Sequence, residues 1–406
     1  MECRALNAGR HMISPEKPLN IVFITDPYIE PLLEGAVRFA REKGWLLRCG
    51  MRRTGVFPHF EKVDGVIATI NHPETLRRIQ ELRAPTIQIL DILEGTRQIY
   101  PTVVPDYAAL GALGAKHLMR LGRPHFAFYR RFDSPDSNAI RESFVKTMAA
   151  HHHRVISLDY PTMNPGHPSG IGETLSTEEW ERVLAGLLSR LPRPCAIMAE
   201  DDRFGVQLIR LALSVGLRVP EDIAVLGCDE HHPEVDMALV PMSSVNSNLQ
   251  NVGYRAAALL HERLCGRPVA TGLHRIPPKG VVSRHSTALF ICEDKRIGDV
   301  ICKVRSEYSR DLSITEMARE AGMSLRKLQI DCKSALGYSL REELIRCRFS
   351  KAENLLAESD LKVSTIALES GFGDARNMTR FFRIKHKLTP QAWRQLAQSG
   401  NLQLAD

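Results

Sequence analysis

The sequence predicts a two-lobed α/β domain followed by an all-α domain, because the periodicity of its apolar residues changes along the chain. In residues 19–284, short continuous apolar runs alternate with segments of helical periodicity, which is typical of parallel sheets covered by helices on both faces. In residues 297–396 the β-prone runs disappear and every segment has helical periodicity. Since the α/β part is too long for one sheet, its two blocks of alternation predict two similar lobes.

The first lobe begins with a β-prone run at residues 21–24, followed by a turn and a helix that ends at Gly44. The same order then repeats, with Pro73 in the first turn of the next helix. We expect strands at 21–24, 65–69 and 86–90, and helices at 32–43, 73–82 and 107–121.

The second lobe repeats this alternation from residue 126 onward. Its apolar runs are again continuous, which indicates strands that are buried on both faces. We expect strands at 126–129, 155–158, 195–199 and 223–227, and helices at 139–150, 177–191 and 204–215. Residues 111–114 contain two glycines but lie within a helical pattern, so they do not predict a phosphate loop.

Composition excludes several classes of protein. The 406 residues include 54 Lys and Arg against 47 Asp and Glu, and no apolar run approaches the ~18 residues of a membrane helix. The first 20 residues are too polar for a signal-peptide core. Nine cysteines occur singly, without a CxxC pair, which favours a reducing compartment over disulfides or a structural zinc site. We therefore expect a cytoplasmic protein without a membrane partner.

Two segments of the all-α part have the pattern of a helix-turn-helix unit. In the first, an apolar stripe precedes Gly322, and Ser324 is placed to cap the second helix. In the second, Gly371 precedes a helix that starts after Asp374. A glycine in the turn adopts backbone angles that a side chain disfavours, so the two helices can cross sharply. The second helix of each unit could then enter a DNA major groove.

The C-terminal quarter of the chain resembles the DNA-binding domain of the AraC family of transcription activators. That family joins two helix-turn-helix units by a long helix, here expected at 340–357. Three departures from the family pattern are Lys387 in place of glycine, Asn377-Met378 in place of Ser-Tyr, and Cys332 in place of phenylalanine. The matching residues are Ile366-Ala367, Gly371-Phe372, Arg380-Phe381-Phe382-Arg383, Thr389-Pro390 and Trp393-Arg394.

The charge of the second unit agrees with DNA binding. Residues 375–394 contain six basic residues and no acidic residue, although a solvated helix face could have the same pattern. Arginine pairs with guanine, and asparagine or glutamine with adenine, while other basic residues bind phosphates. Our candidate DNA-binding residues are Arg326, Lys327 and Gln329 in the first unit and Arg376, Asn377, Arg380 and Arg383 in the second.

Polar residues follow several strands of the α/β part, where a two-lobed parallel fold binds small ligands. Asp26 and Tyr28 follow the first strand, Asp201 follows the strand 195–199, and Asp229 follows the strand 223–227. A sugar needs hydrogen-bond acceptors and an arginine fork for adjacent hydroxyls, with an aromatic ring against its apolar face. The same residue types also occur in phosphate and metal enzymes.

Residues 216–229, together with Arg141 and Phe144, resemble the effector-binding core of LacI-type repressors and periplasmic sugar-binding proteins. The resemblance implies a periplasmic-binding-protein-like fold in which Arg141, Asp201 and Asp229 contact the sugar. An asparagine is common in that family where this chain has Asp201. Since about 20 residues precede the first strand, we expect no DNA-binding headpiece of the kind that usually stands there in that family.

A LacI-like sensor joined to an AraC-like domain implies a sugar-responsive transcription activator, with xylose or a related sugar as effector. We expect a flexible extension at 1–18, a sugar sensor at 19–286, a linker at 287–296 and a DNA-binding domain at 297–400. The expected partners are a double-stranded DNA operator, RNA polymerase and a second copy of the chain. A regulator of the same build could instead respond to another sugar or act as a repressor.

The remaining alternative is an α/β enzyme that acts on carbohydrate, with the helical domain as a DNA-binding tail. Asp201, Asp202 and Glu230 could form a catalytic carboxylate set, but no nucleophile and base accompany them. The consecutive residues His151-His152-His153 point in different directions, which suits a helix end better than a metal site. His231-His232 could contact the ligand. We expect no cofactor, no metal and no catalytic activity.

Overall fold

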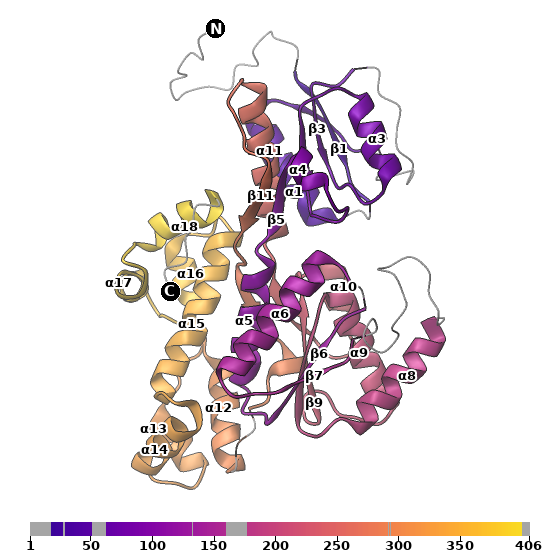
Figure 1. Cartoon of the computed structure of the whole chain (residues 1–406). Helices are drawn as coiled ribbons and strands as arrows, with labels where there is room; N and C mark the ends of the chain where they lie inside the picture. Colours follow the sequence, from indigo (N-terminus) through magenta and orange to yellow (C-terminus); the bar gives the residue numbers. More distant parts are fainter. Residues whose placement is uncertain are drawn as a thin grey trace. The chain divides into compact units, whose positions relative to one another are not determined.

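The computed structural model describes residues 18–26, 29–50, 62–131, 133–159, 177–290, 292 and 294–399. These residues form two compact units, each described here by itself (Figure 1). The first unit comprises Met1–Val104 and Gln250–His274, and the second comprises Pro105–Leu249 and Arg275–Asp406. The chain therefore leaves the first unit after Val104 and returns to it at Gln250.

The first unit is built on a six-stranded sheet in the order β11-β5-β4-β3-β1-β2. The pairs β1–β2, β1–β3, β3–β4 and β4–β5 are all parallel, as the continuous apolar runs predicted. The strands are β1 (Asn20–Ile24), β2 (Leu46–Arg48), β3 (Gly65–Ala68), β4 (Thr86–Ile89), β5 (Pro101–Pro105) and β11 (Gly272–Ile276). The helices are α1 (Glu30–Lys43), α3 (Pro73–Glu81), α4 (Thr96–Ile99) and α11 (Leu249–Leu264).

The α/β lobe of the second unit has a six-stranded sheet in the order β12-β10-β9-β8-β6-β7. Its strands pair in parallel except at the edge, where β12 runs antiparallel to β10. The strands are β6 (His125–Tyr129), β7 (Val155–Ser157), β8 (Cys195–Ala199), β9 (Ile223–Cys228), β10 (Ser243–Asn246) and β12 (Gly280–Val282). The helical elements are α5 (Tyr107–Met119), α6 (Pro135–Ala150), α8 (Thr177–Arg190), α9 (Asp202–Ser214), α10 (His232–Met237) and the 3₁₀ turn η1 (His285–Thr287).

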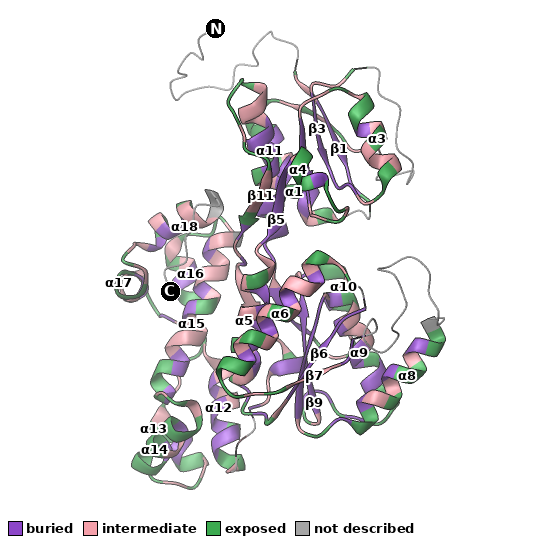
Figure 2. Ribbon diagram, viewed as in Figure 1, coloured by how far each residue is buried: buried purple, intermediate pink, exposed green. Residues whose placement is uncertain are grey.

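Each face of this second sheet is covered by its own pair of helices (Figure 2). On one face, Leu110 of α5 and Phe144 of α6 pack against the strands. On the other face, Trp180 of α8 and Leu208 of α9 do the same. The helices α5 and α6 approach so closely that a Cβ atom at Gly111 would lie 2.1 Å from the Ile140 carbonyl oxygen. Gly111 therefore serves helix packing, in agreement with its place in a predicted helix.

The all-α part of the second unit contains two packed clusters joined by one long helix, α15. Its helices are α12 (Lys295–Glu307), α13 (Ile314–Glu320), α14 (Leu325–Leu336), α15 (Leu340–Glu358), α16 (Val363–Glu369), α17 (Ala375–His386) and α18 (Pro390–Ser399). The first cluster is centred on Leu328 and Cys332, and the second on Phe349, Phe382 and Trp393. The predicted α/β fold followed by an all-α domain is confirmed.

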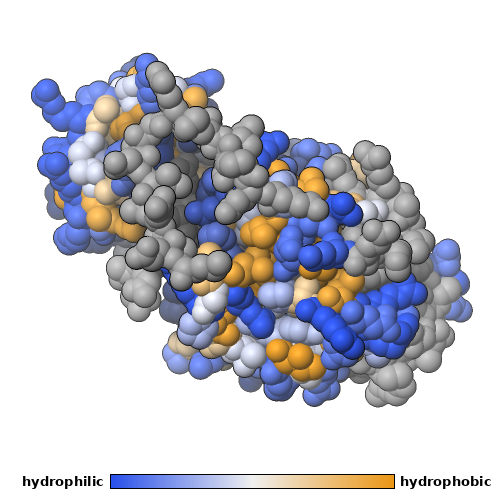
Figure 3. Space-filling model, turned by 90° about the horizontal axis from the view of Figure 1, so that it is seen from above, coloured by the Kyte–Doolittle hydropathy of each residue, from blue (hydrophilic) through white to orange (hydrophobic). Residues whose placement is uncertain are grey.

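One face of the molecule shows how hydrophilic and hydrophobic residues are distributed on its surface. On the face drawn in Figure 3, hydrophilic residues surround smaller groups of hydrophobic ones. Among the helices that the structure describes, none is both long enough and apolar enough to cross a membrane.

Candidate functional sites

Carboxylates gather where β8 and β9 end in the second unit. These strands are parallel neighbours, so Asp201 and Asp202 after β8 lie at the same edge as Asp229 and Glu230 after β9. Asp229 and Glu230 both adopt positive φ angles, 103° and 56°, which are unusual for residues with side chains. The chain thus leaves the extended conformation of β9 at these two residues.

Asp202 and Glu230 are occupied by bonds within the protein. Asp202 is buried and accepts hydrogen bonds from the Ser244 hydroxyl at 2.6 Å and from the His231 amide at 2.7 Å. Burial and the nearby Asp229 charge hold the pKa of Asp202 well above its ordinary value. Glu230 is buried and binds both terminal nitrogens of Arg284. These two carboxylates support the loop that carries Asp229.

Asp201 and Asp229 remain as the carboxylates that could meet a ligand. Asp201 caps α9 by accepting from the Phe204 amide at 3.0 Å and also binds Arg203 at 2.6 Å. Burial raises the pKa of Asp201. Burial and the Asp201 charge raise the pKa of Asp229 to about 6. The carboxylates of Asp201 and Asp229 thus interact with each other and with the exposed guanidinium of Arg203. Such a group of acceptors and donors suits a polyhydroxylated ligand.

Arg141 of α6 is held by a carboxylate that the sequence analysis did not single out. Its Nε lies 2.7 Å from the Oδ2 atom of Asp159, and the Nε of Arg130 lies 3.1 Å from the same oxygen. Asp159 is completely buried and follows β7. A polar residue directly after a predicted strand was the signal that pointed to Asp201 and Asp229. Asp159 has the same signal, because it follows the strand predicted at 155–158.

Glu200 is a second buried carboxylate that the sequence analysis missed. It directly follows β8, accepts from the Arg131 amide at 2.6 Å and is bound by the Ser137 hydroxyl. Burial raises the pKa of Glu200 to about 8. It therefore joins the end of β8 to the start of α6, the helix that carries Arg141.

The other predicted ligand residues lie in the first unit. Asp26 follows β1, and its backbone amide is bound to the Thr69 hydroxyl at 3.0 Å, while its own carbonyl accepts from Asn71 at 2.8 Å. The Asp26 side chain is exposed at the carboxyl end of the strand. Tyr28 lies outside the described residues.

The predicted histidine clusters, 151–153 and 231–232, contact residues of the protein itself. The His231 ring is bound to Glu234, three residues along the chain, and the His153 ring packs on Phe126 with the ring centres 4.8 Å apart. His152 has a φ angle of 62° in the turn after α6. Within the described part of the chain, no group of three or more His, Cys, Asp or Glu side chains is arranged to hold a metal ion.

The two helix-turn-helix units have matching turns. In the first, Gly322 has a φ of 66° and the Met323 amide donates to the Ala318 carbonyl. In the second, Gly371 has a φ of 80° and the Phe372 amide donates to the Ala367 carbonyl. A Cβ atom at Gly371 would also lie 2.6 Å from the Tyr308 carbonyl oxygen, so glycine is required there by both conformation and space.

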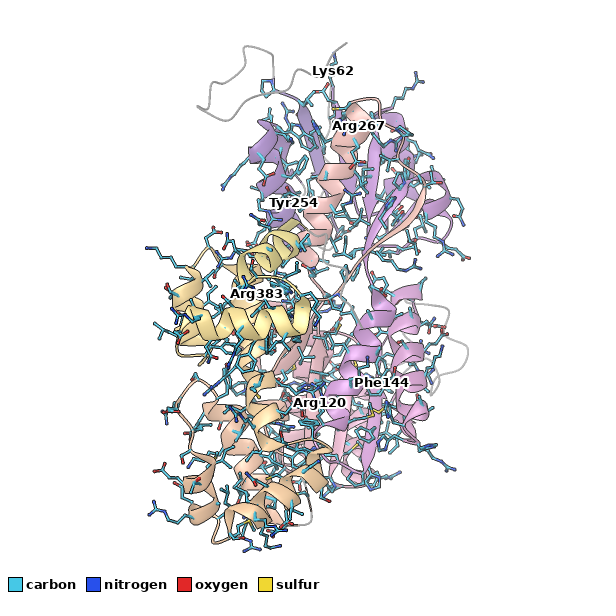
Figure 4. All side chains as sticks on the ribbon, turned by 90° about the vertical axis from the view of Figure 1, so that its left-hand side faces the viewer. Lys62, Arg120, Phe144, Tyr254, Arg267 and Arg383 are labelled. Atoms are coloured by element: carbon cyan, nitrogen blue, oxygen red, sulfur yellow. The ribbon has the colours of Figure 1, made fainter. Side chains whose placement is uncertain are left out.

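The second helix of each unit presents polar side chains to solvent. In α14, Arg326, Lys327 and Gln329 are exposed, and Lys327 pairs with Asp331 at 2.8 Å. In α17, the exposed basic residues near the turn are Arg376, Arg380 and Arg383 (Figure 4 labels Arg383).

Asn377 differs from the other candidates in α17, because its side chain is partly buried and used within the turn. It donates to the Phe372 carbonyl at 2.9 Å and accepts from Arg380 at 3.1 Å. It therefore stabilises the turn and positions Arg380 in the free protein.

The helix α17 is oriented by α15. Glu353 of α15 accepts from Lys385 at 2.7 Å and shares a hydrogen bond with His386 at 2.5 Å. The rings of Phe349 and Phe382 pack beneath these contacts with their centres 5.1 Å apart. The long helix thus sets the direction in which α17 presents its basic face.

Comparisons with known proteins identify both parts of the chain. Residues 115–287 match the model of a periplasmic binding protein-like domain, and residues 317–396 match that of a helix-turn-helix domain. The xylose operon regulatory protein of Haemophilus influenzae is 24% identical over 340 residues, which cover 82% of this chain and 85% of that protein. The protein of the same name from Escherichia coli strain K12 is 22% identical over 82% of this chain and 83% of its own.

Among solved structures, the chain resembles one described as the xylose-binding transcription activator xylR. The TM-score is 0.57 at 20% identity, and the match covers 94% of this chain and 98% of the other. One solved structure thus aligns with both the α/β part and the helical part of this chain. The resemblances inferred from the sequence motifs are confirmed.

Proposed function

We propose that this protein, which joins a periplasmic-binding-protein-like domain to a helix-turn-helix domain, is a xylose-responsive transcription activator. The observation that carries the proposal is the similarity to xylose operon regulatory proteins over 82% of the chain, in which both domains take part. A ligand domain and a DNA domain in one chain allow a sugar to change DNA affinity, since binding at two sites of one molecule is reciprocally coupled.

We propose that Arg141, Asp201 and Asp229 of the second unit contact the sugar, and we retain Asp26 and Tyr28 as ligand-binding residues predicted from the sequence alone. The carboxylates accept hydrogen bonds from sugar hydroxyls, and the guanidinium of Arg141 donates to sugar oxygens. The Nε of Arg141 lies 2.7 Å from the Oδ2 of Asp159, so Arg141 is oriented before the sugar binds. This orientation reduces the side-chain entropy that is lost on binding. We assign the sensor to residues 19–286, the linker to 287–296 and the DNA-binding domain to 297–400.

The DNA surface that we propose consists of α14 and α17. Two units in one chain would enter successive major grooves on one side of the duplex, about 34 Å apart. The exposed residues Arg326, Lys327 and Gln329 of α14 and Arg376, Arg380 and Arg383 of α17 would contact bases and phosphates, and Asn377 would support the second set. The active form would be a cytoplasmic homodimer that recruits RNA polymerase.

A regulatory role, without enzymatic activity, agrees with the carboxylates of the ligand site. Asp202 and Glu230 have their hydrogen bonds satisfied by Ser244, His231 and Arg284, which leaves neither placed to act on a substrate. The relatives described above are named as regulators.

The experiment is a thermal-shift panel of sugars, followed by DNA selection from a random library with and without the sugar that binds. We expect stabilisation by D-xylose, and tighter binding of the selected DNA when xylose is present. Stabilisation by a different sugar alone would overturn xylose as the effector. Weaker DNA binding in xylose would make the protein a repressor, and turnover of the sugar would make it an enzyme.

A further inference from the structure

In the second unit, Arg305 of α12 makes a hydrogen-bonded contact between the α/β lobe and the helical domain. Its Nη2 donates to the Arg120 carbonyl at 3.1 Å, and its Nε donates to Glu343 of α15 at 2.5 Å. Both side chains of this ion pair are largely buried, with 16% of Arg305 and 6% of Glu343 exposed. Arg120, labelled in Figure 4, is the C-cap of α5. One guanidinium thus binds a helix end of the lobe and the long helix of the DNA-binding domain.

Both partners of Arg305, the Arg120 carbonyl and the Glu343 carboxylate, favour a cation between them. The last carbonyls of a helix lack partners within it and carry partial negative charge, so Arg305 caps α5. Glu343 also accepts from the Tyr338 hydroxyl at 2.8 Å, and the Arg346 guanidinium lies 4.6 Å from the centre of the Tyr338 ring. These bonds fix the N-terminal turn of α15, which begins at Leu340.

The same helix α5 is linked by hydrogen bonds to the loop that follows β9. His117, one turn before Arg120, shares a hydrogen bond of 2.9 Å with the Thr287 hydroxyl. The Thr287 hydroxyl lies 2.7 Å from that of Ser243, which in turn accepts from the Arg284 amide at 2.7 Å. Burial and the Arg305 and Arg120 charges lower the pKa of His117 to about 3, so its ring is neutral.

Arg284 completes the path to the ligand site. Its guanidinium binds Glu230, which directly follows Asp229, the proposed sugar contact. The Glu230 amide donates to the Ser244 hydroxyl at 3.0 Å, so the loop is held at several points. Asp229 and Glu230 both have positive φ angles, which side chains disfavour and which persist only where the surrounding contacts hold them. A movement of Asp229 on sugar binding would therefore displace Arg284.

We propose that Arg305 is the positioning residue through which the sugar site controls the DNA-binding domain, by way of Arg284, Ser243, Thr287, His117 and the end of α5. This inference rests on the proposed function and names the route of its regulation. The helix α15 lies between α14 and α16, so a shift of its N-terminal turn changes the relative placement of both helix-turn-helix units. Contiguous networks of hydrogen bonds and ion pairs are one physical route by which distant sites are coupled.

The test compares Arg305→Gln, Glu343→Gln and Thr287→Val with the unmodified full chain. The readout is the ratio of DNA affinities with and without saturating D-xylose, and xylose affinity is measured separately by calorimetry without DNA. We expect each variant to reduce the ratio at least fivefold toward one, while its xylose affinity stays within about threefold. The double variant of Arg305 and Glu343 should lose no more than either single one, since both act through one contact.

Lys303→Gln is the matched control, because Lys303 also forms an ion pair on α12, with Glu320 at 2.5 Å, but does not touch the α/β lobe in the described contacts. It should keep the full ratio. Unchanged ratios in all three test variants, with normal binding of xylose and DNA, would overturn the route through Arg305. If xylose does not change the DNA affinity of the unmodified chain, so that its ratio is one, the proposed function fails instead. Thr287→Val keeps the shape of the side chain, so it tests the path even if the Arg305 variants unfold.

Discussion

Asp159 is completely buried, and its Oδ2 atom lies 2.7 Å from the Nε of Arg141. The same oxygen is 3.1 Å from the Nε of Arg130, so one carboxylate binds two guanidinium groups. A buried charge is costly unless it is paired, and Asp159 is paired with both guanidinium groups, while Arg130 also forms an ion pair with Asp133 at 3.3 Å. Asp159 thus determines how Arg141 is presented at the proposed sugar site.

Replacing Asp159 with Asn should destabilise the protein by about 3–5 kcal/mol, because two arginines lose their buried counter-charge. Sugar affinity should fall as well, since Arg141 loses the ion pair that orients it. Urea unfolding and calorimetry measure the two effects. Glu81→Gln is the control, because it breaks an exposed ion pair with Arg77 and should cost at most about 0.5 kcal/mol. Equal costs for the two variants would contradict the structural role of Asp159.

Replacing Asp229 with Asn should weaken xylose binding by roughly 10- to 100-fold, which corresponds to the loss of a charged hydrogen bond of about 1.5–3 kcal/mol. DNA binding without sugar should remain, because Asp229 lies in the α/β lobe. Calorimetry and fluorescence anisotropy with labelled DNA test the two expectations. Asp236→Asn, an exposed carboxylate on the following helix α10, should change neither. Parallel loss of both activities would argue against separate sugar and DNA sites.

Replacing Glu200 with Gln should flatten the dependence of stability on pH. Burial raises the pKa of Glu200 from 4.5 to about 8, so the folded protein holds a proton that the unfolded chain releases near pH 4.5. The contribution of this group to stability therefore falls as pH rises from about 4.5 to about 8, by an amount on the order of a few kcal/mol. Glutamine stays neutral throughout this range, so the free energy of unfolding of the variant should fall less as pH rises.

Thermal unfolding of both proteins between pH 5 and pH 8 measures the difference. Glu142→Gln removes an exposed carboxylate from α6 and should leave the pH profile of the unmodified protein intact. A Glu200 variant with the unmodified profile would show that this carboxyl does not titrate in the window.

Replacing Arg376, Arg380 or Arg383 with Gln should weaken DNA binding in one of two distinguishable ways. Loss of a phosphate contact lowers affinity for all sequences and reduces the salt slope of binding by about 0.9. Loss of a base contact costs about 1–3 kcal/mol and relaxes the preference at one position of the site. Affinity is measured over a range of salt concentrations on selected and mutated DNA.

The control for these variants is Arg154→Gln, which removes the same charge from an exposed position in the α/β lobe. It should change neither affinity nor salt slope. If it weakened binding as much as the α17 variants do, the effect would come from overall charge and not from a DNA-binding face.

The main strands and helices could be predicted because their signals are local. Apolar runs predicted β1, β3, β4, β6, β7, β8 and β9, and Ser324 and Asp374 cap the helices they were expected to start. Five strands were not predicted, namely β2, β5, β10, β11 and β12; β5 has proline at both ends, and β2 and β12 have only three residues each. These segments become strands because neighbouring strands supply their hydrogen-bond partners, and the sequence of the segment alone does not contain that information.

The candidate sites were predicted to a similar degree. Residue type and position after a strand pointed to Asp201 and Asp229, which lie together at the ends of adjacent strands. Asp202 and Glu230 had the same signal but are occupied by Ser244 and Arg284. The hydrogen bond of Asn377 to Phe372 was also not predictable from its chemical type. Which polar groups remain available depends on partners brought close by folding.

The sequence by itself determined the order of the two domains, the helix caps and the glycine turns of both helix-turn-helix units, because each depends on residues within a few positions of one another. Only the tertiary structure decided that Asp159 orients Arg141 and that Arg305 reaches the Arg120 carbonyl, 185 positions away in the chain. Such pairs form when the packing of helices on sheets brings distant segments within hydrogen-bond distance. The physical reason is that backbone preferences act locally, whereas ion pairs and caps between elements depend on the complete packed fold.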